Sequence, residues 1–222
     1  IAGALSGKTG IIENCVSNVE INAYQNAGGI AGMVTGYGTT ATIRGCANLA
    51  NIKASFNIVG GILGKADYPA TIENCYNRGA VESGAWKAGG VAGYLNDSGA
   101  VVKTCYTTGA VSATSGEAAA VIGKRSYGTA DTSTLFYLDT LTADSNATAI
   151  SEADLKAVPE ALQSAFQKAP AGKNDGYPVL NFEVKSYTVT ITVSPEKAAV
   201  KIEGQTGTQA GTVWTFTLSE GT

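Results

Sequence analysis

The sequence contains no histidine, and few of its residues carry charge. Without imidazole, Ser-His and Cys-His nucleophilic pairs, histidine metal ligands and the usual proton shuttle near neutral pH are excluded. Charged residues make up only 15% of the 222 residues, with 15 Lys+Arg against 18 Asp+Glu, so no basic field exists to attract a phosphate backbone. We therefore expect no nucleic-acid partner and none of the catalytic designs that depend on histidine.

Long hydrophobic runs and a leader pattern are missing as well. No run of about 18 apolar residues could span a bilayer, and the first residues lack the charged and then apolar pattern of a signal peptide. The hydrophobic fraction of 44% is still ordinary for a chain with a buried core. We expect a soluble segment without membrane insertion, cut at both ends from something longer.

Glycine is abundant, with 28 residues, nearly twice the average usage of about 7%. The glycines recur with the spacing of the four cysteines, which are 31, 29 and 30 residues apart: Cys15, Cys46, Cys75 and Cys105. An aliphatic residue stands three positions before each cysteine, another six after it, and a third fifteen or sixteen after it, within the phrases GGIAG, GGILG, GGVAG and AAVIG. Self-similarity at this period predicts a solenoid whose units bury their apolar faces against one another.

The residue types favour a β repeat over a helical one. The apolar residues are β-branched, the segments are about four to six residues long, and Gly, Asn, Ser and Thr fill the gaps. We predict an all-β fold, a parallel β-helix of about four 30-residue coils with three short strands in each. The bends are expected at Asn14, Asn74 and the glycine pairs 28–29, 60–61 and 89–90.

Two columns support this register. The residues two positions before the cysteines alternate in charge: Glu13, Arg44, Glu73 and Lys103. Stacked strands would hold them about 4.8 Å apart, where opposite charges attract and like charges repel. The cysteines would form a second column, for which we favour reduced, inward-facing thiols over disulfides between adjacent coils. A metal site is disfavoured because the cysteines come one per coil and not as a C-x-x-C cluster.

Where the phrases I-x-N-C-Y and G-G-I-A-G recur together, the sequence resembles the GLUG motif family. This family occurs as repeats in large bacterial surface and secreted proteins, including some immunoglobulin-A-specific metallopeptidases. The resemblance covers about residues 1–125, with departures at Gly45, Thr104 and 119–120. It implies an extracellular setting, at the cell surface or cell wall of a bacterium. It implies no catalytic residue here, because the H-E-x-x-H zinc helix of those peptidases is absent.

Residues 126–185 read as a cap for the open end of the solenoid. Residues 135–138 are strand-like, Ser151 and Asp154 form an N-capping pair, and Pro159 divides the following segment into two short helices. The apolar residues at helical spacing are Leu155, Val158, Leu162 and Phe166. A strand is expected over 180–184.

Alternation with period two then predicts three antiparallel strands, at 187–193, 200–202 and 214–218. This C-terminal antiparallel β segment, residues 186–222, resembles the start of a bacterial immunoglobulin-like module. About 36 residues are too few to bury a full sandwich core, so we interpret the module as partial.

Catalysis is disfavoured because a retaining glycosidase needs two carboxyl groups roughly 5–5.5 Å apart, and the repeat places no acidic pair that close. We therefore predict no catalytic residue, no metal site and no cofactor. The candidate ligand-binding residues are four tyrosines near the turn that follows the glycine phrase: Tyr37, Tyr68, Tyr94 and Tyr127. Three of them stand 22 positions after their cysteines, and such a column could contact a ligand or simply close the turn. Three further aromatics, Tyr24, Phe56 and Trp86, drift in position, and we interpret them as packing.

We expect a non-enzymatic module of a bacterial surface protein, a rigid spacer that presents an adhesive face to a glycan or to a host or extracellular-matrix protein. The alternative is an accessory, substrate-engaging segment of a large secreted peptidase or glycan-degrading enzyme. The oligomeric state is left open.

Overall fold

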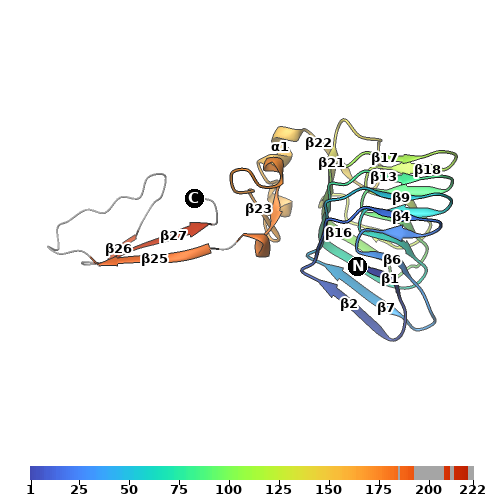
Figure 1. The fold of residues 1–222 in the computed structure, drawn as a ribbon, viewed down its shortest axis with the longest axis horizontal. Coiled ribbons are helices and arrows are strands. Elements are labelled where there is room, and N and C mark those ends of the chain that lie inside the picture. Colours follow the sequence, from blue (N-terminus) through green and yellow to red (C-terminus); the bar gives the residue numbers. More distant parts are fainter. Residues whose placement is uncertain (185, 193–207, 211–212, 220–222) are drawn as a thin grey trace.

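The computed structural model describes residues 1–184, 186–192, 208–210 and 213–219 (Figure 1). The chain winds into a parallel β-solenoid of about five turns, followed by a small helical segment and a small antiparallel sheet. The all-β parallel solenoid predicted from the repeats is thus confirmed. No helix in these ranges is long and apolar enough to cross a membrane.

The coils build four parallel sheets, named here A to D. Sheet A contains β1 (Ala2–Leu5), β6 (Ala31–Val34), β11 (Leu63–Ala66), β15 (Ala92–Leu95) and β19 (Ile122–Arg125). Sheet B contains β2 (Thr9–Glu13), β3 (Val16–Ser17), β7 (Thr40–Arg44), β8 (Ala47–Asn48), β12 (Ala70–Asn77), β16 (Val101–Thr107), β20 (Thr129–Ala130), β21 (Leu135–Leu138) and β22 (Thr148–Ile150). Sheet C contains β4 (Ile21–Ala23), β9 (Ile52–Ala54), β13 (Val81–Ser83) and β17 (Val111–Ala113). Sheet D contains β5 (Ala27–Gly28), β10 (Ile58–Gly60), β14 (Lys87–Gly89) and β18 (Glu117–Ala119).

Each full coil therefore passes through four sheets, one more than the three strands predicted. The additional strand leads into the glycine pair: β10 ends at Gly60 and β11 begins at Leu63. The glycine pair makes the sharp bend between them, and a Cβ at Gly61 would collide with the carbonyl of Gly90 and the side chain of Asn77. The bend predicted at the glycine pairs is confirmed, and it separates the strand of sheet D from the strand of sheet A.

The residue before each cysteine adopts the same left-handed backbone conformation in every coil. The φ angles are 53° at Asn14, 58° at Gly45, 55° at Asn74 and 50° at Thr104. Asn and Gly enter this region readily, whereas a β-branched residue such as Thr104 does so at a cost. The departures from the sequence motif at Gly45 and Thr104 therefore leave the backbone path unchanged.

The cysteines line the core between sheets A and B as free thiols, as predicted. Each thiol donates to the carbonyl oxygen of the residue two positions before it, for example Cys75 Sγ to Glu73 O at 3.2 Å. The sulfur of Cys105 in turn accepts the amide N–H of Cys75 at 3.4 Å, and the sulfur of Cys75 accepts that of Cys46. Burial raises the pKa of the Cys75 thiol well above its ordinary value. Cysteine thus serves here as a small core residue whose thiol donates one hydrogen bond and accepts one.

A second internal ladder lies two positions after the cysteines and was not predicted. Asn48 Nδ2 donates to Asn77 Oδ1 at 2.7 Å, and Asn77 Nδ2 donates to Thr107 Oγ1 at 3.3 Å. All three side chains are buried. The side-chain amide of Asn48 also donates to the carbonyl of Ala50, and that of Asn77 to the carbonyl of Gly79, in the turns that follow. Buried amides paired along the axis fix both the turn and the register of successive coils.

The predicted charge column has the expected register. Glu13 lies opposite Arg44, Arg44 opposite Glu73, and Glu73 opposite Lys103. It forms two ion pairs: Arg44 to Glu13, with N···O distances of 2.5 and 2.6 Å, and Lys103 to Glu73 at 2.9 Å. These side chains remain partly exposed, so the column contributes to register more than to stability.

Residues 126–185, predicted to cap the end of the solenoid, divide between two places. β21 and β22 continue sheet B at the end of the stack, whereas the helical segment that follows, called the cap below, covers a lateral face. Its elements are α1 (Glu152–Lys156), η1 (Glu160–Leu162), β23 (Phe166–Gln167), η2 (Asn174–Gly176), β24 (Val179–Leu180) and η3 (Asn181–Glu183). The four apolar residues predicted at helical spacing are buried against outward side chains of sheet B, including Tyr76, Tyr106 and Phe136. These four are Leu155, Val158, Leu162 and Phe166. Ser151 caps α1 as predicted, whereas the strand predicted over 180–184 is wrong, because the chain turns into η3 after Leu180.

At the C-terminal end of the solenoid, one carboxylate takes the place of a turn carbonyl. Inside the stack, a turn carbonyl accepts two amides of the preceding coil, as Val121 O does from Val91 and Ala92 at 2.8 and 3.0 Å. At the last coil the buried Asp144 takes this role, and its Oδ2 accepts the amides of Val121 and Ile122 at 2.8 and 2.6 Å. The side chain thereby replaces the carbonyl of a following coil.

The C-terminal antiparallel sheet has the order β25-β27-β26, from β25 (Ser186–Thr192), β26 (Thr208–Ala210) and β27 (Val213–Ser219). The strands predicted near 187–193 and 214–218 are present. The strand predicted at 200–202 lies outside the described residues.

Candidate functional site

The structure places the four tyrosines chosen from the sequence in different surroundings. Tyr37 and Tyr127 are exposed, by 98% and 61%, in the turns after β6 and β19. Tyr68 packs against the core, and Tyr94 lies within β15, not in the following turn. No ring contact joins any two of them in the part of the chain that the structure describes.

Tyr94 belongs to a polar seam on the outer side of sheet A. It lies opposite Lys65 on one side and Lys124 on the other. Its hydroxyl donates to Asn96 Oδ1 at 2.8 Å and lies 2.9 Å from Ser126 Oγ. These hydrogen bonds hold the ring along the strand, so Tyr94 contributes to a half-buried network and offers only part of its ring to solvent.

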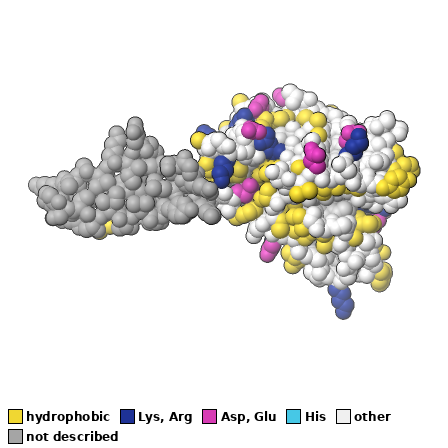
Figure 2. All heavy atoms as spheres, viewed as in Figure 1, with side chains coloured by type: hydrophobic (Ala, Val, Ile, Leu, Met, Phe, Trp, Pro, Cys, Tyr) yellow, Lys and Arg dark blue, Asp and Glu magenta, His cyan; other side chains and the backbone are white. Residues whose placement is uncertain are grey.

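A different set of aromatics is exposed together. Tyr24, Phe56 and Trp86 occupy the turns between sheets C and D in three consecutive coils, and are exposed by 70%, 52% and 53%. We call these three residues the aromatic edge. Figure 2 shows hydrophobic side chains gathered at the end of the coils farthest from the cap. The interpretation of these residues as packing is therefore wrong: they lie nine, ten and eleven positions after their cysteines, and this drift of one residue per coil hid the column.

Backbone and side-chain hydrogen bonds hold the aromatic edge in place. Phe56 N–H donates to the carbonyl of Tyr24 at 3.0 Å, and the two rings lie 6.1 Å apart with nearly parallel planes, 12° between them. In the next coil, the hydroxyl of the buried Ser83 accepts the amide of Trp86 at 3.0 Å and donates to Asn57 O at 2.5 Å. The rings are therefore displayed by a fixed backbone.

Lys87 connects the aromatic edge to the seam. Its ammonium nitrogen lies 4.7 Å from the ring centroid of Trp86 and 5.1 Å from that of Tyr94, within the range of cation–π attraction. It also lies 3.9 Å from a carboxylate oxygen of Glu117, which pairs with Lys124 at 2.7 Å. Aromatic faces, a cation and hydrogen-bonding groups thus lie side by side on this surface.

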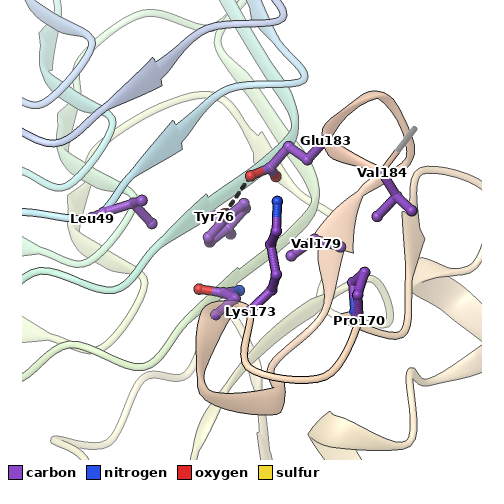
Figure 3. Close-up of a pocket in the computed structure, with 8 residues that line it drawn as sticks. Leu49, Tyr76, Pro170, Lys173, Val179, Glu183 and Val184 are labelled. Carbon is purple, nitrogen blue, oxygen red and sulfur yellow. Dashed lines mark hydrogen bonds between the residues drawn. The ribbon is translucent and has the colours of Figure 1, made fainter. Parts of the chain in front are cut away.

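A cavity of about 170 Å³ lies between the solenoid and the cap (Figure 3). It is lined by Leu49, Tyr76, Pro170, Lys173, Asn174, Val179, Glu183 and Val184. Tyr76 donates its hydroxyl to Glu183 at 3.1 Å, and Leu180 N–H donates to the same carboxylate at 2.9 Å. Burial raises the pKa of Glu183, and burial also raises the pKa of Tyr76. The cavity lies where the cap packs on the solenoid, and the phenol of Tyr76 at its edge stays protonated.

The acids of the coils are largely engaged by cations. Besides the two pairs of the charge column, Glu82 pairs with Lys53 at 2.6 Å and Asp67 with Lys65 at 2.7 Å. Within the described ranges, no group of three or more Cys, Asp or Glu side chains could hold a metal ion. The acids named here are thus engaged in ion pairs with cations of the coils.

The fold and these surfaces define the chain as a β-solenoid with a cap on one lateral face. No family model matches the chain, and no curated protein sequence matches it. It is similar to the crystal structure of a proposed immunoglobulin A1 protease from Bacteroides ovatus, with 21% sequence identity and a TM-score of 0.60. The alignment covers 78% of this chain and 57% of that one. At this identity the similarity establishes a shared fold, and the chain spans little more than half of that protein.

Proposed function

We propose that this chain is a non-enzymatic module of a bacterial extracellular or cell-surface protein, a rigid spacer that also presents a binding face in the manner of an adhesin. The observation that carries the proposal is the combination of continuous internal ladders with an exposed aromatic edge. The spacing of coils is held by buried thiols and amides, while the exposed aromatics make no contribution to that core. The resemblance to GLUG repeats supports the extracellular bacterial setting.

Rigidity follows from how each coil is bonded to its neighbours. Sheets A to D run the length of the stack, and buried side-chain ladders add bonds along the same axis. Bending the stack would break several parallel ladders at once, because each repeat bonds only to its neighbours. Such an element keeps the parts of a large protein at a fixed separation.

The pairing of acids with cations supports a non-enzymatic role. Glu13, Glu73, Glu82 and Glu117 each form an ion pair with a lysine or arginine of the coils. Catalysis by paired carboxylates instead places two acids beside each other.

A second candidate is an accessory segment of a large secreted peptidase or glycan-degrading enzyme that engages the substrate. The similarity to the Bacteroides ovatus protein, whose description names immunoglobulin A1 protease activity, favours it. In that case the chain should bind immunoglobulin A1 without cleaving it.

One set of measurements tests both proposals. The purified chain is incubated with immunoglobulin A1 and with a panel of polysaccharides, and products are analysed by mass spectrometry, while small-angle X-ray scattering reports its shape. We expect no cleavage, and scattering that the rigid stack of about five coils reproduces. Cleavage of any substrate would contradict the proposed function, and capture on immobilised immunoglobulin A1 would favour the second candidate.

A further inference from the structure

We propose that the aromatic edge, Tyr24, Phe56 and Trp86, is a binding site for a linear glycan that lies along the solenoid axis. This inference rests on the proposed function, since it names the ligand class that the binding face would take. It also moves the site from the turn of Tyr37 and Tyr127 to the opposite side of the coil, between sheets C and D.

The size of the aromatic edge favours a glycan over a protein. Fully buried aromatic side chains contribute about 150 to 250 Å² each, so three rings exposed by 70%, 52% and 53% offer about 350 Å². A stable protein interface needs about 800 Å² from each partner. The neighbouring turn residues, such as Ser55 and Gly116, are small and polar or lack a side chain, and they do not widen the apolar area.

The spacing of the rings suits a chain of repeating units. Successive coils are about one strand spacing apart, about 4.8 Å, and each of three coils supplies one ring at the same corner. A linear glycan offers an apolar face at every sugar ring, which can contact an aromatic side chain while its hydroxyls stay outward. A polymer parallel to the axis would therefore cross the stacked pair of Tyr24 and Phe56 and then reach the ring of Trp86 in the next coil.

Hydrogen-bonding groups lie where sugar hydroxyls would need them. Gln25 and Ser55 are exposed beside Tyr24 and Phe56 in the same turns, and Asn57 is half-buried. Lys87 holds its ammonium beside the Trp86 ring. Ligand sites generally combine an apolar contact area with a few polar groups that fix orientation, and the aromatic edge has both.

The experiment uses the full chain and a printed array of linear polysaccharides, chitin and xylan oligosaccharides, hyaluronan and mucin glycans. Any bound glycan is then titrated in soluble form against the native chain, Trp86→Ala, and the triple variant Tyr24→Ala/Phe56→Ala/Trp86→Ala. We expect at least about a tenfold loss of affinity for Trp86→Ala and no measurable binding by the triple variant, as for truncation of a central aromatic anchor. Circular dichroism and thermal melting confirm that the variants stay folded.

Tyr37→Ala is the matched control, because it removes an even more exposed aromatic ring from a turn of the same solenoid on another side. It should bind as the native chain does. The inference is overturned if no glycan of the array binds, if the triple variant binds unchanged, or if Tyr37→Ala loses binding equally. These outcomes leave the proposed function standing if the chain remains a rigid, non-cleaving particle, so the two failures are distinguishable.

Discussion

The aromatic column on sheet B and the aromatic edge differ in what covers them. On sheet B, Tyr76 and Tyr106 stack with ring centroids 5.0 Å apart and planes 7° from parallel, and the cap buries both. At the aromatic edge, Tyr24 and Phe56 are also nearly parallel but remain in solvent. Stacking of this kind is a consequence of register in any solenoid, so the covering element decides whether an aromatic column stabilises the fold or is free to bind.

The covered column also shows how the cap recognises its face. The hydroxyl of Tyr106 donates to the carbonyl of Pro178, and Asn174 Nδ2 donates to the same hydroxyl at 3.2 Å. Phe166 meets the Tyr106 ring edge-on at 5.4 Å. Rings with a polar tip that finds a partner are suited to such an interface. The aromatic edge has no comparable protein partner in the described part of the chain.

The largest expected effect comes from breaking the covered column. Tyr106→Ala should lower the free energy of unfolding by about 3–5 kcal/mol, because it leaves a cavity under the cap and removes a buried hydrogen bond. Trp86→Ala should change it by about 0.5 kcal/mol or less, as for exposed positions. Urea unfolding followed by circular dichroism measures both. Equal losses for the two variants would contradict the distinction between covered and uncovered aromatics.

The sequence repeats allowed the stack, its register and the inward thiols to be predicted, since these follow from a fixed period. The position of the cap could not be predicted, because it depends on which outward side chains find a partner. One signal was present: the tyrosines that follow Cys75 and Cys105 are large aromatics on the outward side of a strand. Two adjacent outward tyrosines at a constant spacing indicate a covered face.

The aromatic edge escaped prediction for the opposite reason. Its residues do not keep a constant distance from the cysteines. By register, the turn between sheets C and D is one residue longer in the second coil than in the first, which a turn absorbs without disturbing the stack. In the third coil the turn has the same length as in the second, and Trp86 stands one position after the residue that matches Phe56. The role of Asp144 could not be predicted from the sequence either, because it depends on two amides more than twenty residues away in the chain.

The second prediction concerns the closed end of the stack. Asp144→Ala should cost about 1–3 kcal/mol, because it leaves the buried amides of Val121 and Ile122 without an acceptor. Hydrogen exchange should accelerate at those two amides first. Asp139→Ala, an exposed acid in the same segment, is the control and should unfold as the native chain does. A silent Asp144→Ala would show that the end of the stack needs no replacement carbonyl.

A smaller effect is expected from the carboxylate beneath the cap. Burial raises the pKa of Glu183 above 4.5, so the folded state binds its proton more tightly than the unfolded state does. The associated stability is fully present below the unfolded pKa and is lost as pH rises through the folded pKa. Glu183→Gln should flatten the pH dependence of the unfolding free energy in this window, measured from pH 4 upward. An unchanged slope in the variant would assign the dependence to another group.

The smallest effect is expected where charges are stacked in solvent. The side chains of Arg44 and Glu13 are 51% and 45% exposed, which places their ion pair with the uncovered parts of the solenoid. Arg44→Gln should cost about 0.5 kcal/mol or less, and about 1 M salt should remove even that, because exposed pairs are screened. A double-mutant cycle with Glu13→Gln isolates the coupling. A coupling above about 2 kcal/mol would mean that the charge column stabilises the stack as the covered aromatics do, and that exposure alone does not separate the two kinds of column.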